Sequence, residues 1–295
     1  MGQGAEFTSA IRLRSCEPRT RAFAELCAKM AVVTDRAPLY QEIHGDGCPI
    51  VLAHGFGGSG RNFGPQVRAL RDRWRISVFD ARGHARSPAE DAPSLYTPAA
   101  TLADFAAVVE RLGAPSAIVG GLSMGAASAT RFALAYPERV RALVIAAFPR
   151  GDQASRDWAR ALARQLEQKP ALEALAAVSH MLGAPLAGAD LGLVARGLAE
   201  HPVHGLRHTL RGLLSQQTAV AEVAEALSEM DFPILLVAGG LDQGALRAAA
   251  AFERHCPRAR IAVIPGAGHV VNLQAAPAFN ERLLAFLREH SASLE

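Results

Sequence analysis

Short apolar runs recur along the chain and predict the strands of a single sheet. Seven runs are rich in aliphatic or β-branched residues, and most are followed by Gly, Asp or Pro: Leu39–Ile43, Ile50–Ala53, Ile76–Phe79, Ala117–Val119, Ala142–Ala146, Ile234–Ala238 and Ile261–Ile264. Apolar runs without polar alternation are typical of strands buried on both faces of a parallel sheet. Helical stretches lie between them, near residues 62–72, 98–112, 124–136, 244–255 and 276–290. This alternation predicts an α/β fold with a mostly parallel, doubly wound sheet.

The stretch 150–230 interrupts the alternation, because it is rich in Ala, Leu, Arg and Glu and contains no convincing strand. Glycines and prolines divide it into about four predicted helices, with breaks at Pro170, Gly183–Pro185, Pro202 and Gly205. Since the stretch lies between two predicted strands, we interpret it as a helical cap (lid) inserted into a core of residues 37–149 and 231–295. Residues 1–36 are expected to be a peripheral extension, part of it vector-derived.

Composition narrows the class of protein. Half of the 295 residues are hydrophobic and 20% are charged, which is enough apolar material for a sizeable core and excludes a disordered chain. Lys and Arg number 31 against 28 Asp and Glu, so the small excess gives no electrostatic reason to expect a nucleic-acid partner. No apolar run reaches the roughly 18 residues of a membrane span, and no secretory signal is evident. We therefore expect a cytoplasmic globular protein, whose oligomeric state the sequence leaves open.

A first glycine motif, Gly55–Gly60, reads G-x-G-x-x-G between a predicted strand and a predicted helix, and Asp80 lies 20 residues after Gly60. That pattern is typical of dinucleotide binding, in which the glycines admit the pyrophosphate and the acid binds a ribose. Taken alone, it favours a nicotinamide or flavin enzyme.

A second motif, Gly121–Gly125, reads G-x-S-x-G and joins the strand at 117–119 to a helix that begins at Met124. This context indicates a nucleophile elbow, a sharp turn that lifts a serine hydroxyl out of the sheet. Glycines two residues on either side of Ser123 let neighbouring chains pass without a Cβ clash. The next amide, that of Met124, lies at a helix N-terminus, close to any developing negative charge. Ser123 is therefore the candidate nucleophile.

A serine nucleophile needs a base, and the base needs an acid to orient it. Asp242 and His269 each follow a predicted strand through a short glycine-containing loop, at the sheet edge where parallel sheets place their sites. The order Ser123, Asp242, His269 is the one that a large group of serine hydrolases uses. Asp242 has a second interpretation, because an aspartate there would also cap the following helix.

These segments together resemble the α/β-hydrolase superfamily, in its capped branch of esterases, lactonases and C–C-bond hydrolases. The resemblance spans roughly residues 39–287. It rests on the elbow and the two triad loops, on His54–Ser59, which is similar to the HGxG oxyanion loop, and on Phe79–His84, which is similar to the D-x-R-G-H segment. Ala85 departs from the family, which often has a glycine there.

The resemblance reassigns the first glycine motif. In such hydrolases, the loop that corresponds to the one after His54 supplies a backbone amide to the oxyanion hole. The resemblance therefore implies that the N–H groups of Phe56 and Met124 form this hole. A three-residue constellation in the correct local contexts outweighs one glycine motif. Some relatives carry the triad acid one strand earlier, which makes Asp152 the alternative to Asp242.

The activity that the resemblance implies is cleavage of a small carboxylic ester through an acyl-enzyme, with no cofactor and no metal. A lactone or enol-lactone substrate and C–C-bond hydrolysis on the same triad are the alternatives. More distant ones are a small-molecule binding module without turnover and a dinucleotide-binding protein. The cysteines form no CxxC pair and no Cys/His cluster, which argues against a zinc site: Cys16, Cys27, Cys48 and Cys256.

Other polar residues are assigned to structure or to the cap. His204, Arg207 and Arg211 fall on one face of a predicted cap helix. Such a face is usually solvated, and the alternative is a pocket for a substrate carboxylate, with Arg207 and Arg211 as substrate-binding candidates. Structural roles are expected for His54, His84 and Asp80, the last as the cap of a turn beside Arg82.

Overall fold

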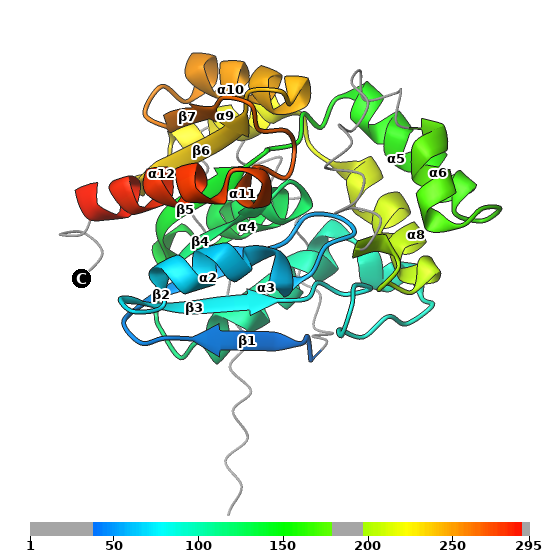
Figure 1. Ribbon diagram of the computed structural model, residues 1–295, viewed down its shortest axis with the longest axis horizontal. Helices are drawn as coiled ribbons and strands as arrows, with labels where there is room; N and C mark the ends of the chain where they lie inside the picture. The colour runs from blue at the N-terminus through cyan, green and yellow to red at the C-terminus, as the bar shows by residue number, and fades with distance from the viewer. Residues whose placement is uncertain (1–37, 179–196, 291–295) are drawn as a thin grey trace, which may run out of the picture.

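The computed structural model describes residues 38–178 and 197–290. The predicted N-terminal extension and the break at Gly183–Pro185 lie outside the described residues. The described chain folds around a seven-stranded sheet with the order β1-β3-β2-β4-β5-β6-β7 (Figure 1). All seven predicted strands are confirmed, as β1 (Gln41–His44), β2 (Cys48–Ala53), β3 (Trp74–Phe79), β4 (Ala117–Leu122), β5 (Val140–Ala146), β6 (Ile234–Gly239) and β7 (Arg260–Ile264).

Six of the strands run parallel, and β1 is the exception, since it pairs antiparallel with β3 at the edge of the sheet. The predicted α/β class and the mostly parallel sheet are thereby confirmed. Every residue of β4 is buried, because β4 lies at the centre of the sheet with helices over both faces. Its apolar side chains and two glycines therefore fix the position of whatever follows its carboxyl end.

Helices connect the strands and cover both faces of the sheet. In Figure 1, α2 and α12 lie on one face, and α3 and α4 lie on the other. The predicted helix at 62–72 is divided in two, because Pro65 starts a new helix at its first turn. The core helices, short turns included, are η1 (Gly60–Phe63), α2 (Gly64–Leu70), η2 (Pro93–Tyr96), α3 (Pro98–Arg111), α4 (Met124–Ala135), η3 (Pro137–Arg139), α10 (Gln243–His255), α11 (Val271–Gln274) and α12 (Ala276–Glu289).

The segment after β5 is helical, as the sequence predicts. Its described helices are α5 (Gln153–Gln165), α6 (Ala171–Val178), α8 (Val203–Gly212), η5 (Leu214–Gln216) and α9 (Val220–Ser228). Helices α5, α6 and α8 pack around a second apolar cluster, which also contains Met124 of α4 and Leu214 of η5, beside the ends of the parallel strands (Figure 1). Helix α9 instead packs against α10 and gives Val223, Ala224 and Leu227 to the main core. Of the helices between β5 and β6, α5, α6, α8 and η5 therefore share one cluster, and α9 belongs to the main core.

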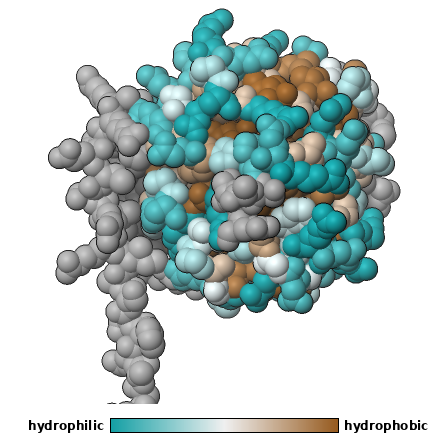
Figure 2. Space-filling model, turned by 90° about the vertical axis from the view of Figure 1, so that its left-hand side faces the viewer, coloured by the Kyte–Doolittle hydropathy of each residue, from teal (hydrophilic) through white to brown (hydrophobic). Residues whose placement is uncertain are grey.

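The surface is a mixture of polar and apolar residues. Figure 2 shows mainly hydrophilic side chains on the face turned to the viewer, with smaller hydrophobic patches between them. Within the described residues, no helix is both long enough and apolar enough to cross a membrane.

Candidate active site

Ser123 occupies a strained turn between β4 and α4. Its φ of 53° and ψ of −111° lie in a region that residues with a side chain rarely adopt. The neighbouring strands hold it there, since the Ser123 amide donates to the carbonyl of Ala146 at 2.9 Å. The side chain is half-buried and stands at the carboxyl end of the central strand. The structure thus has the backbone geometry that the G-x-S-x-G motif predicts.

The two elbow glycines are required by close backbone contacts. A Cβ on Gly125 would lie 2.0 Å from the carbonyl oxygen of Ala53, and one on Gly121 would lie 2.5 Å from the same atom. Real Cβ atoms do not approach backbone oxygens so closely, so any side chain would force β2 away from the elbow. The glycines let α4 begin directly beside the end of β2, as expected from the motif.

The loop after β2 passes next to Ser123. A Cβ on Gly55 would lie 3.6 Å from the Cβ of Ser123, so Gly55, the residue before Phe56, lies beside the elbow. The loop is held in a tight turn, because the amide of Gly58 donates to the carbonyl of Gly55 at 3.0 Å. Met124 is the first residue of α4, where an amide has no partner within the helix. Both predicted oxyanion donors therefore belong to segments that adjoin the elbow.

His269 and Asp242 form a direct pair. The Nδ1 atom of His269 lies 2.7 Å from Oδ2 of Asp242. The side chain of Asp242 is 12% exposed and that of His269 is 40% exposed, so the acid is shielded while the imidazole reaches the surface of the site. Because the carboxylate accepts from Nδ1, the lone pair of the neutral ring is on Nε2, as a general base requires.

The loops that carry this pair are packed together. The amide of Leu241 donates to the carbonyl of Ala267 at 2.9 Å, and a Cβ on Gly239 would lie 2.1 Å from the carbonyl oxygen of Gly268. The amide of Gly268 also donates to the side chain of Gln274 at 2.8 Å. Since β6 and β7 are neighbours in the sheet, these contacts fix Asp242 against His269.

The carboxylate of Asp242 makes two contacts, one with each oxygen. Oδ1 accepts from the amide of Ala245 at 3.0 Å and caps α10, while Oδ2 pairs with His269. Burial by itself raises the pKa of the Asp242 carboxyl, but the hydrogen bond and charge of His269, together with the amides of Ala245 and Gly244, outweigh it, and the net pKa is lowered. Asp152, the alternative acid, caps α5 by accepting from the amide of Ser155 at 2.9 Å, and it lies 3.3 Å from Arg150.

The acid of the dinucleotide-like motif is buried in its own loop. Asp80 accepts from the amide of Gly60 at 2.8 Å and from Nε of Arg86 at 2.7 Å. Asp80 also accepts from the amide of Arg86 at 3.2 Å, so it caps this turn, as expected from the sequence, and its cationic partner is Arg86. Arg82 instead forms a two-pronged pair with Asp104, with distances of 2.8 and 2.9 Å.

The departure at Ala85 has a structural counterpart in the cap. Ala85 adopts a φ of 43°, which favours the glycine that the family often has there. Its amide donates to Nδ1 of His201 at 2.7 Å, and His201 lies just before α8. A cap residue therefore holds the strained turn, a contact that the sequence did not reveal.

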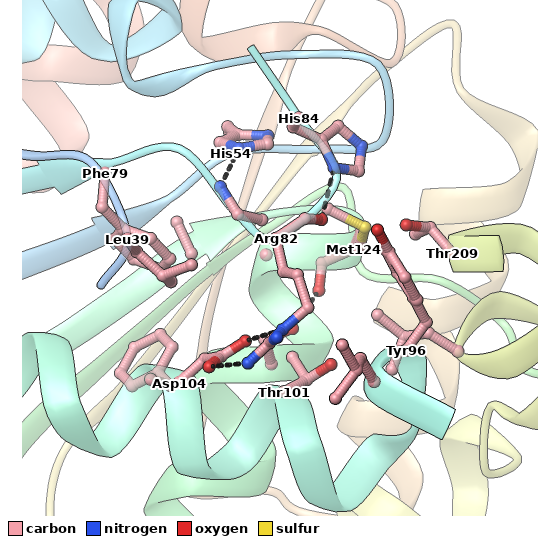
Figure 3. Close-up of a pocket in the computed structure, with 17 residues that line it drawn as sticks. Leu39, His54, Phe79, Arg82, His84, Tyr96, Thr101, Asp104, Met124 and Thr209 are labelled. Atoms are coloured by element: carbon pink, nitrogen blue, oxygen red, sulfur yellow. Dashed lines mark hydrogen bonds and ion pairs between the residues drawn. The ribbon is translucent and has the colours of Figure 1, made fainter. Parts of the chain in front are cut away.

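A pocket lies beside Met124, at the start of α4 (Figure 3). The Arg82–Asp104 pair lies against its wall, and Tyr96 and Thr101 face it from the segment before α3 and from α3 itself. Ser123 is not among its lining residues. Sequence reasoning did not single out Tyr96, Thr101 or Asp104, because each is an ordinary residue of a predicted helix or loop.

The two cap arginines make contacts with acidic residues. Arg211 pairs with Glu167, and Arg207 lies 3.9 Å from Asp91. A substrate-binding role for Arg207 and Arg211 stays a prediction.

An elbow serine after β4, an acid–histidine pair on the loops after β6 and β7, and helices inserted between β5 and β6 are the features of the α/β-hydrolase class. A family model described as the alpha/beta hydrolase fold matches residues 49–276. The chain belongs to this family.

Named relatives include hydrolytic enzymes. The chain is 32% identical over 266 residues to a candidate carbamate hydrolase, RutD, of Azorhizobium caulinodans, a match that covers 86% of this chain and 96% of the relative. It is 27% identical over 262 residues to a pimeloyl-[acyl-carrier protein] methyl ester esterase of Yersinia enterocolitica, covering 85% and 98%. The solved structure of a thermophilic esterase from Thermogutta terrifontis has a TM-score of 0.74 at 23% identity, covering 85% of this chain and 93% of that one. The expected coarse class, a hydrolase, is supported.

Proposed function

We propose that the protein is a serine hydrolase that cleaves small carboxylic esters with Ser123, His269 and Asp242. The observation that carries the proposal is the placement of all three residues at one edge of the sheet. Ser123 is in the strained elbow, and His269 and Asp242 are paired at 2.7 Å on the loops after β7 and β6. This set provides a nucleophile, a base and an orienting acid, which acyl transfer requires.

In the proposed reaction, Nε2 of His269 takes the proton of the Ser123 hydroxyl as its oxygen attacks the ester carbonyl. The carbonyl electron pair moves to oxygen, where the amides of Phe56 and Met124 stabilise it. Removing one such donor typically costs about 3–4 kcal/mol of transition-state stabilisation. The intermediate collapses, and the leaving alcohol takes the proton from His269. Water then attacks the acyl-enzyme with the same base, and the carboxylic acid leaves as Ser123 regains its proton.

The names of the relatives support acyl chemistry but differ in the leaving group. The Yersinia relative is named for a methyl ester, and the Azorhizobium relative for a carbamate. Both bonds present a carbonyl carbon to the nucleophile, so the same three residues serve either substrate. A carbamate is therefore the second candidate, beside the lactones expected from the sequence.

The test is hydrolysis of p-nitrophenyl esters of increasing acyl length by wild type and by Ser123→Ala. Ser228→Ala, at the end of α9, is the matched control. We expect turnover by wild type and by the control, and a loss of roughly 10⁴-fold or more in Ser123→Ala with an unchanged fold. Ester turnover retained in Ser123→Ala would refute the nucleophile assignment.

Labelling with a serine-directed fluorophosphonate tests the nucleophile without a substrate. Intact mass should show one adduct in wild type and in the control, and none in Ser123→Ala. Labelling without ester turnover would support the nucleophile and direct the substrate search to carbamates and lactones. A folded wild type that neither reacts nor turns over would favour a binding role.

A further inference from the structure

A short segment just before α8, residues 197–201, lies directly on the loop after β2. A Cβ on Gly197 would lie 2.3 Å from the carbonyl oxygen of Gly57, so the two backbones are in contact. A Cβ on Gly57 would in turn lie 2.9 Å from Cδ2 of Leu198, which is buried. Since Gly57 is the residue after Phe56, the 197–201 segment covers the loop that carries one predicted oxyanion donor.

The second apolar cluster links the same segment to the other predicted donor. Met124 and Leu198 are both buried members of this cluster, and Phe56 packs against it. Close-packed side chains pass on a displacement of their neighbours. The positions of Phe56 and Met124 are therefore coupled to the packing of the helices inserted between β5 and β6.

His201 fastens the 197–201 segment to a second core loop. The residue is 7% exposed, and its Nδ1 atom accepts from the amide of Ala85 at 2.7 Å. Because Nδ1 is the acceptor, the neutral ring carries its proton on Nε2. Burial lowers the pKa of His201, and the nearby backbone of Gly57 opposes this effect only in part. At neutral pH the ring is therefore an uncharged imidazole between the Ala85 turn and Gly57.

Two further imidazoles continue this contact on the core side of the loop. The rings of His201 and His84 are 5.1 Å apart between centroids, and those of His84 and His54 are 5.2 Å apart (Figure 3). Phe56 packs nearly perpendicular to His84, at 5.8 Å. His54 in turn lies 2.7 Å from the carbonyl oxygen of Gly55. The loop after β2 is thus held by His54 and His84 from the core and by His201 from the inserted segment.

We infer that His201, through the 197–201 segment, is a positioning residue for the oxyanion hole, a role that rests on the proposed ester hydrolysis. It fastens the segment to the Ala85 turn, and the segment covers Gly57. Gly57 in turn fixes the amide of Phe56 where the oxyanion forms. A misplacement of about 1 Å can cost about 100-fold in rate. Because the oxyanion forms only after the attack, the loss should appear in kcat and not in KM.

The test compares two buried histidines in the hydrolysis of p-nitrophenyl esters. His201→Leu removes the acceptor of the Ala85 amide, whereas the matched control His208→Leu removes a contact of α8 with the carboxylate of Asp91. We expect kcat to fall about tenfold or more in His201→Leu, with KM within about threefold of wild type. His208→Leu should keep kcat within about threefold of wild type. His201→Asn, whose Oδ1 can accept from the Ala85 amide, should recover part of the loss.

Gly197→Ala tests the same contact from the other side. Its Cβ would meet the carbonyl oxygen of Gly57 at 2.3 Å, so kcat should fall while His201 is kept. This variant decides the matter if His201→Leu does not fold, and circular dichroism gives the folded fraction of each variant. The rate of serine labelling by a fluorophosphonate should fall in parallel with kcat, because the phosphoryl oxygen occupies the same hole.

The outcomes separate this inference from the proposed function. An unchanged kcat in folded His201→Leu or in Gly197→Ala, with an active wild type, would overturn the inference and leave the proposed function intact. Equal losses in His201→Leu and His208→Leu would also overturn it, because they would reflect the general packing of α8. So would a raised KM at constant kcat, as expected of a substrate contact. A wild type that neither hydrolyses esters nor reacts with the fluorophosphonate would overturn the proposed function, and the inference with it.

Discussion

Acidification should destabilise the protein in a range where its carboxylates stay ionised, because His54 is buried as a neutral imidazole. The ring is 1% exposed, and both nitrogens are used: Nδ1 lies 2.7 Å from the carbonyl of Gly55, and Nε2 accepts from the amide of Ala81 at 2.8 Å. A proton on Nε2 would break the second bond and place a charge in the core. Burial accordingly lowers the pKa of His54 to about 4, against the small opposing effects of Gly55 and Asp80.

The magnitude follows from the linkage between protonation and folding. The unfolded state binds the proton near pH 6.5 and the folded state near pH 4, so stability is fully present above pH 6.5 and is lost as the pH falls toward 4. The difference corresponds to about 3 kcal/mol below pH 4 and to about 2 kcal/mol by pH 5. Burial also lowers the pKa of His84 and of His201, so both act in the same direction. The pKa values of Asp80 and Asp242 are lowered, so those carboxyls titrate below this range.

The assay is urea unfolding at several pH values between 7 and 5, with the free energy of unfolding taken at each. We expect a loss of at least about 2 kcal/mol in wild type. His54→Gln should be less stable at pH 7 but should lose about 2 kcal/mol less than wild type between pH 7 and 5. His255→Gln, in the last turn of α10, is the control and should keep the wild-type slope. A His54→Gln slope equal to that of wild type would refute the reasoning, as would an imidazole NMR titration with a native pKa near 6.5.

Three substitutions test the site and its support. Asp242→Asn should keep the cap of α10 but lose the orienting carboxylate, so kcat for ester hydrolysis should drop about 10⁴-fold, and a drop below tenfold would contradict the acid assignment. Gly125→Ala should cost about 3 kcal/mol or more in urea unfolding, because its Cβ would meet the carbonyl of Ala53 at 2.0 Å, and wild-type stability would refute the packing argument. Asp104→Asn should cost about 3 kcal/mol, because it removes the charge of the buried partner of Arg82, whose other acidic contact, Glu90, lies at 3.9 Å, and an unchanged stability would mean that the pair is dispensable.

The sequence predicted most of the fold because its signals are local. Buried strands can be identified from apolar runs without polar alternation, and helices from regular apolar spacing. All seven strands lie where the runs predict them. The elbow was also predictable. Its glycines are required because β2 passes close to them, and a G-x-S-x-G sequence is typical of a turn in which the serine is strained, as Ser123 is. The placement of Asp242 and His269 followed from a topological rule, that parallel strands end at one edge.

Contacts between distant polar residues were not predictable in the same way. The partner of Arg82 is Asp104 on α3, and the partner of Asp80 is Arg86, because side-chain direction decides which of two nearby arginines reaches which acid. Packing likewise places α9 with the core, although its composition is that of the other inserted helices. Propensity specifies that a segment is helical, but not which surface covers it.

The contacts of α8 with the core show why the roles of its polar residues cannot be deduced from their spacing along the helix. Three histidines at or near α8 bind one core loop: His201 accepts from the amide of Ala85 at 2.7 Å, His204 lies 2.5 Å from the carbonyl of Ala89, and His208 lies 2.5 Å from the carboxylate of Asp91. Polar spacing along α8 resembles a solvated face or an anion pocket, yet its imidazoles serve as attachments to residues more than 100 positions away. Two of the three partners are backbone groups, so the side chains of the core loop do not predict these contacts. The same contacts explain how Ala85 is kept in a glycine-like conformation, because the cap supplies a hydrogen bond that a free turn would lack.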